Sequence, residues 1–436
     1  MILRSGATQQ AGSRSAAGAR EGRTVRRPLA RITLANLGCG QIFYLSLLVI
    51  LPDQSLRVGG SAHKTDVLAL VAAIGALVAL AAAIGAGHLS DRRRAATGSR
   101  GGVLAVGAVL TGVLLAVLPA TASVPWLLVV WCGAQLGLNG VLSVVTAALA
   151  DWFSVERRGL ASAYAALGQV LGAALASLMV VLLAAHPAAA AALGGLIFVL
   201  SVMPMVRPPY DVVTQTMPDD QQKTENERAP DQADAPAAPG PQGERRGRGL
   251  YVDVALAWAV RVVVTFSNTL VVTFLNYYVT DVLRPADPQR LVGLAAGLTS
   301  LMVAAGAVVS GRASDRSQRR RPFVIAAVLL MCAGELLLAG WRSVPGAFVA
   351  AAVIGAGYGV YLAVDQALSA DVLPNSHAYG RDFGIMNTAT SAPQIIAPAV
   401  AAVLLGGSKH YSVLFVVGAL TVLSGAGFVL PIKRVR

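Results

Sequence analysis

Charged residues are scarce in this sequence. They make up 13% of its 436 residues, whereas a soluble domain carries about 25%. Apolar residues make up 55%, and the mean hydropathy is +0.64. This balance excludes an ordinary soluble domain and indicates a chain that is mostly embedded in a membrane.

Lysine and cysteine are also rare. Only four of the 35 basic residues are lysines, at positions 64, 223, 409 and 433. The net charge is +13, but the basic residues lie between apolar runs and not on one folded face, so no nucleic-acid partner is expected. The three cysteines, Cys39, Cys132 and Cys332, fall within apolar segments, which indicates buried thiols and no disulfide framework.

The signatures of several other functions are missing. The sequence has no nucleotide-binding motif, no cluster of metal ligands and no pattern of nucleophile and base, and its five histidines are scattered. We therefore predict that the chain is not an enzyme, that it binds no metal or cofactor, and that ATP is not its energy source.

Long apolar runs are what the sequence has in place of these motifs. A spanning helix needs about 20 mostly apolar residues, and twelve such stretches are present. They cover roughly 31–51, 64–89, 101–122, 124–151, 159–184, 187–206, 250–281, 289–311, 322–341, 345–371, 381–406 and 410–431. The sequence therefore predicts an all-α, polytopic membrane protein with twelve transmembrane helices.

Polar segments divide these spans into two sets of six. The longest polar break, 207–249, is rich in Pro, Gln, Asp and Ala, a composition typical of a disordered linker. It would separate an N-terminal bundle, 31–206, from a C-terminal bundle, 250–431. Residues 1–30, which are rich in Arg, Ser and Gly, are predicted to be a disordered tail, and 432–436 a short second tail.

The positions of the basic residues predict the orientation in the membrane. With the N-terminus inside, 28 of the 35 basic residues fall in inside segments and six in outside turns. Cytoplasmic segments carry such an excess. We therefore expect both termini and the linker to be cytoplasmic, in a protein of the cytoplasmic membrane surrounded by lipid.

A charged turn occurs twice, 224 positions apart. Each turn is followed 66 or 67 positions later by an arginine next to a glycine. The first set is Gly87, Asp91, Arg92 and Arg158, and the second is Gly311, Asp315, Arg316 and Arg381. Matched turns at matched spacing indicate a duplicated unit. In a membrane protein, duplicated six-span bundles favour a transporter that rocks one half against the other.

The twelve spans, the central linker and the repeated turns together resemble the major facilitator superfamily. The resemblance implies two pseudo-symmetric six-helix bundles, with spans 1, 4, 7 and 10 lining a central cavity. It also implies that Asp91 pairs with Arg158, and Asp315 with Arg381, as latches of the outward-open state. The alternative is that these residues only cap helices and set topology.

The resemblance is also informative about the solute. The segments 371–374, 380–384 and 393–394 are most similar to the sugar–cation symporters of the superfamily. They imply a small solute, such as a sugar or related polar compound, and a proton or monovalent cation as partner, in a functional monomer. A drug or metabolite efflux antiporter is the alternative, although its usual proline-containing motif is missing from span 5. A second alternative is a sensor of the same fold that does not transport its ligand.

Three ionisable residues fall inside predicted spans, where charge is costly and usually functional. Arg261 and Asp365 lie on spans 7 and 10, at depths that a long arginine side chain can bridge, and Glu335 lies on span 9. Because the position of span 4 equivalent to Asp365 is Val145, the carboxylate breaks the repeat. We predict a role in coupling or substrate binding for Asp365 and Arg261; a structural ion pair is the alternative.

Uncharged polar residues on the cavity-lining spans are predicted to line the path. They are Asn36, Gln41, Asn139, Asn268, Asn276, Gln366 and Tyr361. Amides and aromatic hydroxyls suit a polar solute, although aromatic residues at helix ends are often interface anchors.

Overall fold

A computed structural model describes residues 27–153, 155–207, 241–317, 319–372, 379–405 and 410–431. These residues form helices and short connections, and no strand occurs among them. The predicted all-α class is therefore confirmed.

The N-terminal half begins with a helix over 27–45, which continues into the π-helix η1 (Ser46–Ile50). The following elements are α2 (Leu51–Thr97), α3 (Gly101–Val117), the 3₁₀ turn η2 (Leu118–Ala120), α4 (Val124–Trp152), α5 (Val155–Leu182) and α6 (Pro187–Val206).

The C-terminal half repeats this plan. It consists of α9 (Pro241–Tyr278), the π-helix η3 (Val279–Leu283), α10 (Pro288–Ser317), α11 (Arg321–Gly340), α12 (Val344–Val372), α13 (Tyr379–Leu405) and α14 (Tyr411–Val429). The π-helix η3 thus ends the first helix of the second half, whereas η1 lies within the first helix of the N-terminal half, which continues beyond it to Gly60. Such segments are frequent at functional sites.

The helices are long and apolar enough for the predicted twelve crossings. Among the described residues, eleven helices meet the length and composition of a membrane span, and the first of them, 27–97, is 71 residues long. It contains two predicted spans, because Gly60 (φ 65°, ψ 177°) breaks it and lets the chain turn back. A positive φ of this kind is accessible to glycine at no steric cost. The protein is a multi-pass membrane protein.

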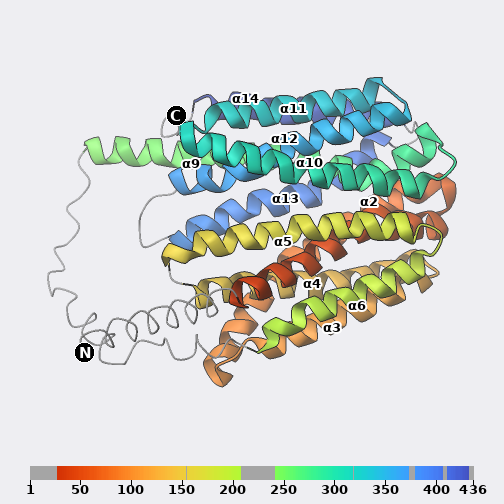
Figure 1. The fold of residues 1–436 in the computed structure, drawn as a ribbon, viewed down its shortest axis with the longest axis horizontal. Helices are drawn as coiled ribbons and strands as arrows, with labels where there is room; N and C mark the ends of the chain where they lie inside the picture. The colour runs from red at the N-terminus through yellow and green to blue at the C-terminus, as the bar shows by residue number, and fades with distance from the viewer. Residues whose placement is uncertain are drawn as a thin grey trace, which may run out of the picture.

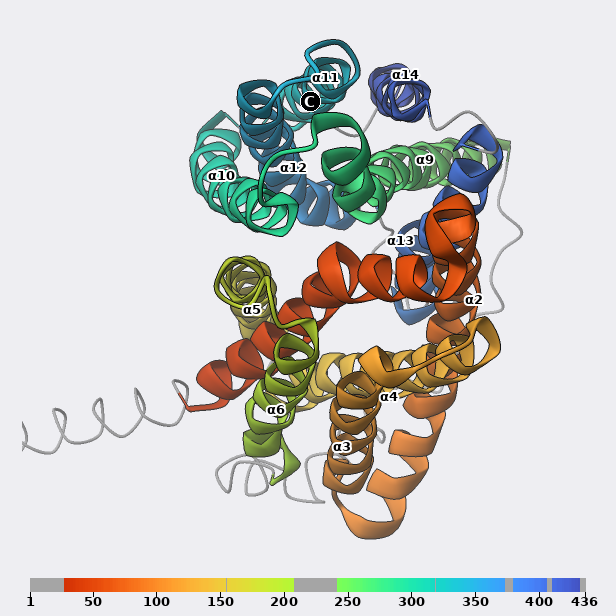
Figure 2. The same cartoon turned by 90° about the vertical axis from the view of Figure 1, so that its right-hand side faces the viewer.

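The two halves lie side by side (Figures 1 and 2). In Figure 2, α5 of the first half lies beside α10 of the second, and α2 lies beside α13, as their contacts confirm. We call the end of the bundle with the turns at 98–100 and 319–320 the motif end. The end with the turns at 183–186 and 284–287 is the opposite end, and Gly60 belongs to it because Lys64, four residues later, pairs with Asp281 there.

Glycines bring helices close together within each half. A Cβ added at Gly172 of α5 would lie 2.2 Å from the Leu37 carbonyl oxygen, and one at Gly359 of α12 would lie 2.2 Å from the Val303 carbonyl oxygen. Small residues allow this approach, which drives helix association in lipid. Gly172 and Gly359 therefore have a packing role.

The second half begins earlier than predicted. Helix α9 starts at Pro241 and not near residue 250, so its first turns occupy part of the predicted linker. Proline is favoured at the first helical position because its missing N–H would have no partner there. Residues 208–240, the rest of the predicted linker, lie outside the described part of the chain, as do the two predicted tails.

Candidate functional site

A buried ion pair joins α9 to α12 inside the C-terminal half. The Arg261 Nε atom donates to Asp365 Oδ1 at 3.1 Å, and its Nη2 atom donates to Asp365 Oδ2 at 2.5 Å. Each residue is only 6% exposed. The structure thus brings together the two residues that the sequence placed at compatible depths. A two-pronged arginine–carboxylate contact of this kind is among the stronger polar interactions in proteins.

Aromatic residues lie near this pair on both of the helices that carry it. Tyr361 lies one helical turn before Asp365 on the same face of α12, and its hydroxyl donates to Asp365 Oδ1 at 2.7 Å. The ring of Tyr358 stacks on that of Tyr361, with centroids 6.4 Å apart. On α9, the Trp258 indole donates to the Thr388 hydroxyl of α13 at 3.0 Å. The carboxylate is therefore held by two polar partners at an aromatic wall.

The predicted polar residues of the N-terminal half lie elsewhere. Asn36 donates to the Ile32 carbonyl at 2.9 Å and accepts from Gln169 of α5 at 3.2 Å. Gln41 is fully buried, with its amide nitrogen 3.3 Å from the Met179 sulfur. These two amides lie between the first helix and α5, and in this structure they do not join the Arg261–Asp365 pair. Asn139 of α4 bonds to Gln135 of the same helix.

The remaining predicted residues of the C-terminal half also separate. Asn268 is half-buried, and no side-chain hydrogen bond is found for it among the described residues. Asn276 lies near the opposite end of α9, where it donates to the Leu48 carbonyl at 2.7 Å and to Gln289 at 2.9 Å. The side chain of Gln366 lies outside the described part. Of the predicted path residues whose side chains the structure describes, Tyr361 is therefore the one that bonds the ion pair.

Contacts between the two halves close the opposite end. Lys64 of α2 pairs with Asp281 of η3 at 2.5 Å, and its ammonium lies 4.7 Å from the centre of the Tyr277 ring. The Tyr277 hydroxyl donates to the Pro52 carbonyl at 2.9 Å, and that of Tyr411 donates to Asp281 at 2.7 Å. Lys64 and Tyr277 are buried, so water does not reach between the halves at these residues.

The sequence did not predict this closure, because Lys64 was used only as one of the six basic residues in outside turns. One feature of the sequence does indicate a contact here. Pro52 follows Leu48 by four residues and has no N–H, so it cannot bond the Leu48 carbonyl as a helix requires. That carbonyl is the one that Asn276 of the other half reaches.

The charged turn at the motif end forms a network centred on Arg100, a residue that was not among the predicted partners. Arg100 donates to Asp91 at 2.6 Å and to Asp151 of α4 at 2.9 Å, and also bonds Ser90. Burial lowers the pKa of the Arg100 guanidinium, but the hydrogen bonds and charges of the two carboxylates raise it by more, so the pKa lies above its ordinary value. Arg100 remains charged at any physiological pH.

The second turn shows part of the same arrangement. Arg320 donates to Ser314 at 2.8 Å, as Arg100 does to Ser90. The side chains of Arg158, Asp315 and Arg381 lie outside the described part, so the pairs Asp91–Arg158 and Asp315–Arg381 stay predictions. The glycines Gly87 and Gly311 are half-buried, and Arg92 and Arg316 are exposed.

Asp91→Asn and Asp315→Asn are expected to slow transport more than they reduce the amount of folded protein. The Asp91 side chain is 66% exposed, so its ion pair contributes at most about 1 kcal/mol to folding. The same small energy can shift a balance between two conformations roughly fivefold, here toward the form open at the motif end. Spin-label distances across the motif end measure this shift. Unchanged distances in both variants would rule out the latch.

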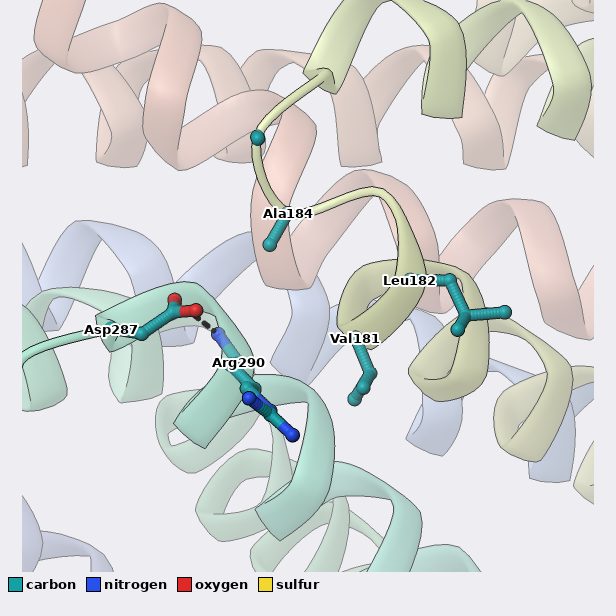
Figure 3. A pocket seen from close by; sticks show the side chains of 6 residues that line it. Val181, Leu182, Ala184, Asp287 and Arg290 are labelled. Carbon is teal, nitrogen blue, oxygen red and sulfur yellow. Dashed lines mark hydrogen bonds between the residues drawn. The ribbon is translucent and has the colours of Figure 1, made fainter.

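A separate pocket lies at the opposite end, between the end of α5 and the start of α10 (Figure 3). Its volume is about 560 Å³, and its lining includes Val181, Leu182, Asp287 and Arg290. Asp287 accepts the backbone N–H of Arg290 at 3.0 Å and so caps α10. The pocket contains none of the predicted site residues, so we do not assign the site there.

Metal ligands do not cluster in the described part of the chain: no group of three His, Cys, Asp or Glu residues there could hold an ion. The three cysteines are free thiols.

Comparisons with known proteins identify the family. The family model "Major Facilitator Superfamily" matches residues 32–284 and 257–435. A D-xylose–proton symporter structure has 14% sequence identity and a TM-score of 0.67, covering 94% of this chain and 98% of that one. The peptide transporter POT has 14% identity and a TM-score of 0.66, covering 93% of each chain.

A third similar structure is a bacterial homolog of the human lysosomal transporter Spinster in an inward-facing, unoccupied conformation. It has 12% identity and a TM-score of 0.61, covering 92% of this chain and 93% of that one. No curated protein sequence matches the chain. At these identities the structures establish the fold, and the family model extends over nearly all of both halves. The chain therefore belongs to the major facilitator superfamily, a family of secondary transporters.

Proposed function

We propose that the protein moves a small polar solute, such as a sugar, across the cytoplasmic membrane by alternating access, coupled to a proton or another monovalent cation. The observation that carries the proposal is the buried pair of Arg261 and Asp365 between α9 and α12. A charge pair at membrane depth is expensive and is therefore retained mainly for function.

The pair supplies a simple coupling chemistry. In this arrangement Asp365 is compensated by Arg261 and by the Tyr361 hydroxyl. A proton that binds the carboxylate removes its need for the guanidinium, so Arg261 can turn to a polar group of the solute. When the cavity opens to the other side and the proton leaves, the carboxylate recovers Arg261. Proton and solute then cross in one cycle.

The surroundings of the pair favour a polar, uncharged solute. Trp258 and Tyr358, both half-buried, offer ring faces on which a sugar can stack, and Arg261 offers several donors to hydroxyl oxygens. A second acid beside the pair is not found among the described residues. An organic cation, which a drug exporter would carry, would therefore have to displace Arg261 from Asp365.

The experiment is an uptake assay with the full chain in proteoliposomes, under an imposed proton gradient, with a panel of radiolabelled sugars and of lipophilic cations. We expect accumulation of at least one sugar, lost when the gradient is dissipated. Accumulation of the cations instead would support an efflux antiporter. Binding without flux of any compound would support a sensor. Either result would overturn the proposal.

The orientation can be tested by thiol labelling of intact cells. We propose that the motif end is cytoplasmic, on the excess of arginine in its turns. Ala96→Cys at the motif end and Ala237→Cys in the predicted linker should resist a membrane-impermeant thiol reagent. Ala286→Cys at the opposite end should react with it. Positions 96 and 286 are both exposed, so they form a matched pair.

The native cysteines give little background in this assay, because Cys39 and Cys332 are buried and Cys132 is half-buried. Labelling of Ala96→Cys and not of Ala286→Cys would show that the protein has the opposite orientation, with the motif end outside.

A further inference from the structure

A second carboxyl group is buried away from the Arg261–Asp365 pair. Glu335 of α11 is fully buried, and its Oε1 atom accepts a hydrogen bond from the Ser267 hydroxyl of α9, which is buried as well. Its Oε2 atom has no hydrogen-bond partner among the residues that the structure describes. This oxygen points at Gly418 of α14, where an added Cβ would lie 2.4 Å from it. The absence of a side chain at Gly418 therefore makes room for the carboxyl group.

No cation compensates this carboxyl group. Among the described residues, no lysine, arginine or histidine forms an ion pair with Glu335. The nearest basic side chain of α9, Arg261, lies six residues before Ser267 and is held by Asp365. An isolated ionised carboxylate in such a place is too costly to persist. The neutral, protonated form needs no cation.

The other titratable groups on the surrounding helices are neutral or engaged. On α11, the nearest is the Cys332 thiol, one turn before Glu335. At the far end of α9, Tyr278 donates to the Leu338 carbonyl, and at the start of α14, Tyr411 donates to Asp281. On α12, Ala350 and Ile354 pack near Gly334. Among the described side chains, Ser267 is thus the one that would stabilise a charge on Glu335.

We infer that Glu335 is a proton-binding site, separate from Asp365, which holds its proton while the opposite end is closed. The proton is bound at Oε2, and Oε1 accepts the Ser267 hydroxyl. Loss of the proton requires water, both to take it up as hydronium and to solvate the carboxylate left behind. Water reaches Glu335 only if α9 moves away from α11 and α14, and α9 is also the helix that carries Asn276 and Tyr277, whose contacts with the other half close the opposite end. Proton binding therefore favours the arrangement seen in this structure.

Infrared spectroscopy of the full-length protein in lipid tests the inference without a solute. At neutral pH we expect the carbonyl-stretch absorption of one neutral carboxylic acid. Glu335→Gln should remove it, and Ser267→Ala should shift its frequency, because the acid loses its hydrogen bond. Asp66→Asn, at an exposed acid of α2, is the matched control and should leave it unchanged. A spectrum of Glu335→Gln identical to that of the wild type would overturn the inference.

The link to conformation has its own measurement. Spin labels at positions 62 and 286, which are exposed on the two halves at the opposite end, report its closure. Raising the pH should lengthen this distance in the wild type but not in Glu335→Gln, which stays neutral. An equal response of both proteins would overturn the link. Neither the infrared nor the spin-label experiment involves transport. Their outcome is therefore independent of whether Asp365 couples the proton to the solute.

Discussion

Asp365→Asn is expected to abolish gradient-driven accumulation of solute and to leave exchange of solute across the membrane. Asparagine has the size of aspartate and can still accept hydrogen bonds from Tyr361 and Arg261, but it does not bind a proton in the physiological range. The solute can then still cross, whereas the proton gradient no longer drives its movement. This expectation follows from the contacts of the Asp365 carboxylate at membrane depth. Arg261 and the Tyr361 hydroxyl bind it there, and protonation of the carboxylate would release them.

The measurement compares accumulation and counterflow in the same proteoliposomes, normalised to the amount of folded protein. Asp66→Asn serves as the control, because it removes the same carboxylate from an exposed part of α2. Full accumulation by Asp365→Asn would reject the coupling role. Asp365 would then be a structural residue, the alternative that the sequence left open.

Arg261→Ala is expected to be more damaging than the removal of both charges. Breaking a buried pair by removing one partner costs about 3–5 kcal/mol, because the remaining charge is left uncompensated. In the double variant Arg261→Ala/Asp365→Ala no charge is left, so most of the loss should be recovered. The readouts are the yield of monodisperse protein and the temperature of thermal unfolding.

An exposed ion pair gives the matched control. Arg57 and Asp53, four residues apart on α2, lie 2.9 Å from each other, with the Arg57 side chain 52% exposed. Arg57→Ala should cost less than about 1 kcal/mol. If Arg261→Ala unfolds at the wild-type temperature, the buried charge of Asp365 does not destabilise the folded protein when its partner is removed, and the prediction is wrong. If the double variant is no better than the single one, lost packing and not lost charge is the cause.

Much of the fold was readable from the sequence, because lipid imposes strong constraints on it. The length of the apolar runs determined the spans, and the repeated turns indicated the two halves. The pairing of Arg261 with Asp365 was also predictable, since two opposite charges at membrane depth have few other charged partners available.

The direction of the uncharged side chains was not predictable. Asn36 and Gln41 lie on a predicted span that is apolar on nearly every face. The sequence therefore does not indicate which face of this helix points toward the cavity and which toward a neighbouring helix. The structure turns both amides toward α5. The contact of Lys64 was not predictable for a different reason: its partner Asp281 is 217 positions away, and no local pattern indicates such a contact.

The contact of Asn276 with Leu48 also bears on how the opposite end opens. The acceptor is a main-chain oxygen whose α-helical donor is missing, because Pro52 follows it by four residues and has no N–H. No substitution at position 48 can remove such an acceptor, so the two halves recognise each other here independently of that side chain. When the halves separate, the oxygen must exchange the amide of Asn276 for water. Hydration of this one carbonyl is then a step in opening, and the rate of opening should depend on how readily water enters the gap.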